Sequence, residues 1–217
     1  MKKRILLFLF ITLQIALFHH VFALAKTDLS PENYFQGKFY TSVKNNFLIA
    51  TERMNDSRFE KTVICMLEHD SKGAFGLVIN KPMGSIPLAM LIDPSLSKTP
   101  EEREKLYGIN ILIFWGGPVE VKKIFVLHSS EYQSESTKNY GGISISQDYN
   151  ILLDIAENKG PQNSLVIFGY SGWGGGQLEG EMERDHWILS DIDLDITFDK
   201  DSNTKWNKAF KNSFIKI

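Results

Sequence analysis

Short runs of apolar residues separated by polar, turn-forming segments extend over most of the chain, and their lengths are those of β-strands. Asn46–Ala50 begins this pattern as a short strand. The runs Thr62–Leu67 and Phe75–Asn80 flank the polar tract Glu68–Gly73, so the pair predicts a β-hairpin. We expect Pro82 to end the second strand, because proline has no N–H to donate to a neighbouring strand.

The same alternation continues through the second half of the chain. Ile109–Trp115 and Lys123–His128 predict a second pair of strands, joined across Gly116-Gly117-Pro118. Gly142–Ser146 alternates apolar and polar residues and predicts a short strand, and Ser164–Phe168 predicts another.

Helical patterns are fewer and lie between or after these strands. Thr99-Pro100-Glu101-Glu102 has an N-cap residue, a proline and early acids, which together indicate a helix start. We expect the other helices at Ile86–Ile92, Asp148–Asn158, from Gln177 onward and at Lys205–Asn212, and an edge strand at Thr197-Phe198. The pattern predicts a single α+β domain over residues 40–217, with antiparallel or mixed strands built on hairpins and with flanking helices.

The first 25 residues differ from the rest. Lys2, Lys3 and Arg4 precede an apolar stretch, and Ala23-Leu24-Ala25 is a small-residue site, so the segment predicts a secretory signal peptide cleaved after Ala25. An uncleaved membrane anchor (residues 5–25) and a wrongly extended start codon are the alternatives. We therefore expect a periplasmic or secreted protein, or else a membrane-anchored one, with residues 26–39 as a linker.

Composition limits the function without naming it. The 217 residues are 43% hydrophobic and 23% charged, which is ordinary for a globular domain. The net charge of −2 becomes −5 once the first 25 residues are set aside, because 21 bases then face 26 acids. An acidic domain argues against nucleic acid as a partner. The one cysteine, Cys65, excludes an internal disulfide framework, and its apolar strand predicts a buried side chain.

The segment Gly169–Gly176 is the most unusual local feature, with five glycines among the nine residues that end at Gln177. We expect a glycine-rich loop between a strand and a helix. Its backbone amides could bind an anion, or the glycines could serve positive φ angles and close packing beneath Tyr170 and Trp173. The loop lacks the lysine of a phosphate-binding Walker loop, which favours the structural interpretation.

Possible catalytic groups are scattered. Ser171 lacks the glycine two positions later that a hydrolase nucleophile elbow needs. Glu179, Glu183 and His186 have metal-ligand spacing, but one copy of that motif is better explained as a solvated polar strip beside a packed helix face. His69 and His128 would share a pocket with Asp148 or the glycine loop only if their hairpins converge.

Three segments in order resemble the YqgE/AlgH family. They are Glu68-His69-Asp70 with Gly73–Pro82; Gly116–Val119 with Phe125–His128; and Gly169–Gly174 with Gly176–Glu181 and Trp187. The resemblance covers roughly residues 45–210. It implies strands bent into a flattened pseudo-barrel, and a family without an assigned activity in which one branch was named as a transcriptional regulator. The export signal departs from the usual pattern of that family.

These observations favour a non-enzymatic binding or interaction domain, with an unknown protein or small molecule as its partner. Enzymatic action on a small anionic substrate and transcriptional regulation remain the alternatives. We expect no cofactor and no metal, and contact with a membrane only through residues 5–25. The candidate ligand-binding residues are His69, His128, Gly169, Tyr170, Ser171, Trp173, Gly174, Gln177 and Glu179.

Overall fold

The computed structural model describes residues 42–92 and 99–213. The predicted signal peptide (1–25) and linker (26–39) lie outside these residues. Within the described ranges, no helix is long and apolar enough to cross a membrane.

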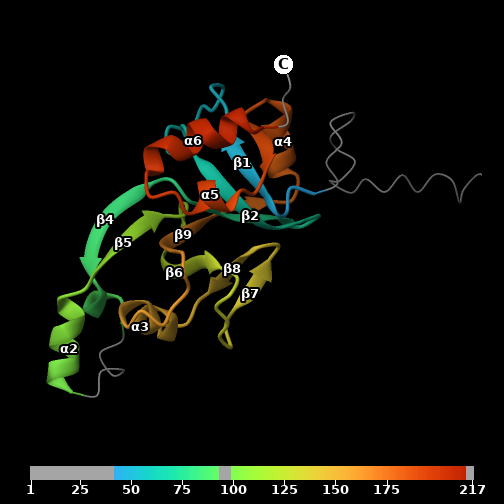
Figure 1. Cartoon of the computed structure of the whole chain (residues 1–217). Helices are drawn as coiled ribbons and strands as arrows, with labels where there is room; N and C mark the ends of the chain where they lie inside the picture. Colours follow the sequence, from blue (N-terminus) through green and yellow to red (C-terminus); the bar gives the residue numbers. More distant parts are fainter. Residues whose placement is uncertain (1–41, 93–98, 214–217) are drawn as a thin grey trace, which may run out of the picture.

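Ten strands form one strongly curled sheet (Figure 1). The main path runs in the order β10-β1-β2-β3-β9-β6-β8-β7, and β5 joins it by parallel pairing with β9 while β4 pairs with β5. The strands are β1 (Asn46–Ala50), β2 (Val63–Asp70), β3 (Gly73–Val78), β4 (Pro82–Pro87), β5 (Asn110–Trp115), β6 (Val119–Ser129), β7 (Lys138–Tyr140), β8 (Ile143–Ser146), β9 (Ser164–Gly174) and β10 (Trp187–Asp191).

Short helices flank this sheet, and α2 lies at the far end of the β4–β5 ribbon (Figure 1). They are η2 (Leu88–Met90), α2 (Pro100–Tyr107), α3 (Asn150–Ala156), α4 (Gln177–Glu183), α5 (Leu194–Thr197) and α6 (Ser202–Lys211). The predicted helices at Asp148–Asn158, from Gln177 and at Lys205–Asn212 are thus confirmed within a few residues.

The alternation of side chains along the strands divides the core between the two faces of the sheet. In β2, Cys65 and Leu67 belong to the largest cluster, whereas Ile64 and Met66 point to the other face and pack with Leu178 of α4. A third cluster lies between strands β5, β6 and β9 and helix α3. Over the described residues, the predicted bent α+β architecture is confirmed as a curled, half-barrel sheet of mainly antiparallel strands.

The predicted pairing of the strands around 109–115 and 123–128 is wrong. Both strands exist as β5 and β6, but β9 lies between them, parallel to β5 and antiparallel to β6. The cause is Gly116-Gly117, which crosses β9 closely instead of forming a hairpin turn: a Cβ at Gly116 would lie 2.3 Å from the carbonyl oxygen of Gly169. A local pattern carries no information on a strand that enters from 50 residues away.

Three further elements differ from prediction. Pro82 begins strand β4 instead of closing a strand, because β4 is an edge strand whose only described partner is β5. The expected helix at 86–92 is the end of β4 followed by the short η2. Thr197 ends helix α5 instead of forming an edge strand, since Asp193 caps this helix by accepting the amides of Asp195 and Ile196.

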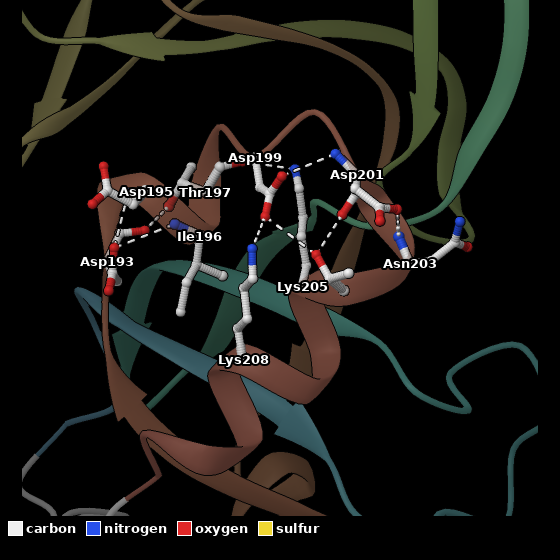
Figure 2. A network of polar contacts seen from close by, with 10 residues as sticks. Asp193, Asp195, Ile196, Thr197, Asp199, Asp201, Asn203, Lys205 and Lys208 are labelled. Atoms are coloured by element: carbon white, nitrogen blue, oxygen red, sulfur yellow. Dashed lines mark hydrogen bonds and ion pairs between the residues drawn. The ribbon is translucent and has the colours of Figure 1, made fainter.

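One lysine of α6 is joined to the end of α5 (Figure 2) and also to the sheet. Lys205 is fully buried, and its Nζ donates to the carbonyls of Thr197 at 2.8 Å and Ile79 at 3.0 Å. Burial lowers the pKa of Lys205 to about 8. Beside it, the Cys65 side chain is buried as predicted, and burial raises the pKa of its thiol to about 12.

Candidate functional site

The glycine-rich segment is a strand and not the expected loop. Residues 164–174 form the continuous strand β9, and its last four residues pair with β3 in antiparallel register. Gly73 makes this pairing close, because a Cβ there would lie 2.1 Å from the carbonyl oxygen of Trp173. Gly169 and Gly175 also allow close backbone approach, since a Cβ there would lie 2.7 Å from the carbonyl oxygens of Gly117 and Ser71, as the structural interpretation predicts. The turn to α4 is confined to Gly175 and Gly176.

Ser171 supports the strand and has no free hydroxyl. Its Oγ is buried and donates to the carbonyl of Gly116 at 3.0 Å. Gly117 passes directly over the same point, where a Cβ would lie 2.2 Å from the carbonyl of Tyr170. This contact fixes the 116–118 segment against β9.

Trp173 is buried and connects strand β9 to helix α4. Its side chain is 8% exposed, and its indole Nε1 donates to Oε2 of Glu181 at 2.9 Å. The indole of Trp187 donates to the same oxygen at 2.7 Å, and Gln177 donates to Oε1 at 3.1 Å. One carboxylate on α4 thus satisfies two tryptophan N–H groups of the sheet and holds the helix in place.

His69 and Glu179 form a buried pair at the same end of the sheet. Nε2 of His69 lies 3.0 Å from Oε1 of Glu179, and both side chains are at most 3% exposed. Nδ1 of His69 accepts the backbone N–H of Val43, so the ring proton is on Nε2 and is donated to Glu179. The expected solvated strip on α4 is therefore wrong for Glu179, although Glu183 is exposed.

His128 lies at the opposite end of β9. His128 of β6 pairs with Ser164 at the start of β9. Near the end of β9, Trp173 pairs with Ala74 of β3, and Ala74 pairs in turn with His69 of β2. Nine residues of strand separate these two points, which corresponds to roughly 30 Å. The structure therefore does not bring His69 and His128 into one pocket.

The surroundings of His128 are a closed network of hydroxyls. Its Nδ1 donates to the carbonyl of Ser129 at 2.9 Å, and its Nε2 accepts from Ser146 Oγ at 3.1 Å. The hydroxyl of Ser146 is hydrogen-bonded to that of Thr137, Thr137 to Ser134, and Ser134 donates to Asp148. Burial lowers the pKa of His128, so the ring is neutral at pH 7 and serves as an acceptor. These hydrogen bonds hold the segment that follows β6, at Ser134 and Thr137, against the end of β8.

The surface around Gly172 brings together the other predicted residues. On the side of β9 that faces β6, Tyr170 pairs with Val119. Beyond this pair, no described strand lies beside residues 172–174 on that side. Gly172 and Gly174 are exposed. Hollows lie on both faces of the sheet at this edge, and both are lined by Gly172 and Trp173.

The hollow on the face of Tyr170, here the Tyr170 groove, is wide and shallow, with a volume of about 490 Å³. Tyr170 and Phe75 form its apolar floor with their rings 4.9 Å apart. Its charged lining consists of Glu68 and Asp70 at the end of β2 and Lys72 in the β2–β3 turn. The groove therefore has two carboxylates against one ammonium.

The hollow on the other face, here the Trp173 pocket, has a volume of about 270 Å³. Trp173, Trp187 and Phe59 contribute aromatic rings, and Pro118 lies at its border. Its charges balance, since Asp56 and Arg58 are paired at 2.6 Å and the lining also contains one further acid, Glu181, and one further base, Arg184.

Several of these residues were not predicted. Phe59 belongs to no motif, and Glu181 lies in a family-resembling segment but has no role predicted for it; their roles follow from the edge-to-face contact of Phe59 with Trp187 and the donation of two indoles to Glu181. A possible signal is the presence of two tryptophans around one helical glutamate, because buried indoles need acceptors. Within residues 42–92 and 99–213, no group of three or more potential ligands is placed to hold a metal.

Comparison with known proteins gives a consistent result. A family model described as AlgH-like matches residues 47–217. A UPF0301 protein of Pseudomonas syringae is 37% identical over 176 residues, which cover 81% of this chain and 90% of that protein. A UPF0301 protein of Pseudomonas putida is 39% identical over 156 residues, or 72% of this chain and 80% of that protein.

Two solved structures are similar as well. The solution structure of the AlgH protein of Pseudomonas aeruginosa superposes with a TM-score of 0.66 at 35% identity, covering 79% of this chain and 89% of that one. A crystal structure of a Corynebacterium diphtheriae protein superposes with a TM-score of 0.60 at 15% identity, covering 80% and 88%. The second likeness concerns the fold alone.

Proposed function

The chain belongs to the AlgH-like family, and on that premise we propose that its folded part is a non-enzymatic binding domain that contacts its partner through the edge of β9 at Gly172. One observation carries this proposal: the three segments that bear the family resemblance converge on that edge. The β2–β3 hairpin, Pro118-Val119 and the residues Tyr170, Gly172, Trp173 and Gly174 line the Tyr170 groove or the Trp173 pocket.

The chemistry of this surface suits binding. It offers exposed glycine backbone, aromatic rings and a few charges, distributed over two hollows that share one strand edge. The enzymatic alternative depended on His69 and His128 acting together, and their separation along β9 removes that motivation. Regulation through DNA gains no support from an acidic domain.

We also propose that residues 1–25 direct export, with cleavage after Ala25 or retention as an anchor. The partner would then be met outside the cytoplasm. The −5 charge of residues 26–217 would favour partners with exposed basic groups there.

Site-specific crosslinking in the source organism tests the binding surface. A photoreactive amino acid replaces Lys72, whose side chain lines the Tyr170 groove, and for comparison Lys159, which is exposed beyond α3. We expect a discrete adduct from position 72 only, and its loss when Gly174→Leu fills the groove. Equal adducts from both positions, or an adduct insensitive to Gly174→Leu, would contradict the proposed surface.

A further inference from the structure

We propose that the edge of β9 accepts an extended peptide as an additional strand, with a basic residue opposite Gly172 and an apolar or aromatic residue next to it. This inference rests on the proposed function and specifies its partner. Proteins that add a peptide to a sheet edge derive affinity from main-chain hydrogen bonds and selectivity from pockets for alternate side chains. The edge at Gly172 has both features.

The strand register shows which backbone groups are available. Successive residues of a strand direct their N–H and C=O groups to opposite edges. Tyr170 pairs with Val119 toward β6, and the N–H of Gly174 is directed to Oε1 of Gln177 at 3.2 Å. Gly172 has the same parity, so its N–H and C=O point away from β3. Among the described residues, Gly172 pairs with Phe75 of β3, and no strand pairs with it on the β6 side.

The glycines leave this edge open. A Cβ at Gly174 would meet no atom within 4 Å, and one at Gly172 would meet the ring of Tyr170 at 3.1 Å. No side chain of residues 172 and 174 therefore obstructs the approach of another backbone.

The two hollows lie where the side chains of an added strand would point. A residue opposite Gly172 in an antiparallel pair shares its face, so its side chain enters the Tyr170 groove. Glu68 is already paired with Lys44 at 2.8 Å, so a basic residue would meet Asp70, beside Lys72, and the rings of Tyr170 and Phe75. The aromatic floor adds a cation–π surface.

The next peptide residue points to the other face. Its side chain enters the Trp173 pocket, where the internal charges are balanced and the walls include the rings of Phe59, Trp173 and Trp187. An apolar or aromatic residue matches this lining. The partner is thus an extended segment with adjacent basic and apolar residues.

Fluorescence anisotropy with a labelled heptapeptide tests this inference. The probe is blocked at both ends and has the sequence Thr-Val-Thr-Lys-Phe-Thr-Val. Two matched peptides replace lysine with glutamate, or carry an N-methyl group on the lysine amide that would donate to Gly172. We expect a Kd below about 1 mM for the parent. Each altered peptide should bind at least about fivefold more weakly, which corresponds to one hydrogen bond or charge contact.

Variants of the protein locate the binding. Gly174→Leu adds a side chain in open space and should weaken the parent peptide at least about tenfold, whereas Glu183→Leu on the exposed side of α4 should not change its Kd. Asp70→Asn should weaken the lysine peptide and leave a glutamine-containing peptide unchanged. Circular dichroism establishes that the variants are folded.

The outcomes of these experiments distinguish failure of the peptide inference from failure of the proposed function. Equal affinity for the N-methylated peptide, or no effect of Gly174→Leu, overturns strand addition. No peptide binding together with a crosslink that Gly174→Leu abolishes overturns this inference and leaves the proposed function standing. Loss of both overturns both. Protection of the Gly172 amide that rises with protein concentration would assign the edge to a second copy of this chain and would also overturn the peptide proposal.

Discussion

At the scale of single residues, the carboxylate of Glu181 determines how firmly α4 is held on the sheet. Glu181→Leu would leave the indole N–H groups of Trp173 and Trp187 without their acceptor. An unsatisfied buried donor costs about 1–3 kcal/mol, so we expect a loss of about 2–4 kcal/mol in the free energy of unfolding. Urea denaturation measures it. Glu181→Gln retains one acceptor oxygen and should lose less than half as much; equal losses would contradict the account.

Lys205 provides a prediction on pH. Its pKa is about 8 in the folded protein and about 10.4 in an unfolded chain, so between these values the unfolded state binds more protons. Stability contributed by this group therefore rises with pH across that window, and the charged form is the costly one below pH 8.

Lys205→Met removes this dependence. We expect the stability of the wild type relative to this variant to rise by about 2 kcal/mol from pH 7 to pH 9.5. Urea denaturation at several pH values measures the difference, and Lys208→Met, which removes an exposed lysine of the same helix, is the control. A difference that is constant with pH would show that Lys205 does not titrate in this range.

At the scale of elements, β9 and the segment 116–118 depend on each other. Gly117 has φ +148° and a Cβ there would collide with Tyr170, whereas Gly174 has open space around it. Gly117→Ala should therefore lower the free energy of unfolding by more than about 3 kcal/mol, and Gly174→Ala should change it by less than about 1 kcal/mol. Thermal and urea denaturation compare the two. Similar effects would mean that the crossing is not as close as described.

The elements were largely predictable where a local pattern decides them. The β2–β3 hairpin, α2, α3, α4 and α6 follow from apolar runs, caps and turn residues. The sequence pattern predicts β9 only as far as Phe168, because several of the remaining residues are glycines, whose strand conformation depends on pairing with β3. β10 was missed because Trp187–Asp191 follows a helix directly and pairs with β1, some 140 positions earlier.

At the scale of the whole molecule, the candidate site depends on which segments the curled sheet brings together. Tyr170, Trp173, Gly174 and Gln177 line the two hollows, whereas His69, Ser171 and Glu179 are buried at the same end of the sheet. His128 belongs to the other end of the sheet. The sequence pattern could identify the motif-bearing segments, but the two hollows depend on Phe59 and the β2–β3 turn, which only the tertiary fold places beside β9.

Export of the whole molecule depends, in our proposal, on residues 1–25. N-terminal sequencing of the protein from its native host should begin at Lys26, in the periplasmic or secreted fraction. Fractionation with the membranes and an intact Met1 would favour the anchor instead. A soluble cytoplasmic protein that begins at Met1 would contradict export.

The central claim is that the β9 edge at Gly172 is open for a partner, and hydrogen exchange at single amides tests it most directly. In the free protein, the amide of Gly172 should exchange at least about a hundredfold faster than that of Trp173, which faces β3. Adding the lysine–phenylalanine heptapeptide should slow Gly172 and leave His128 unchanged. A Gly172 amide as protected as Trp173 in the free protein, or unaffected by the peptide at saturation, would contradict the account.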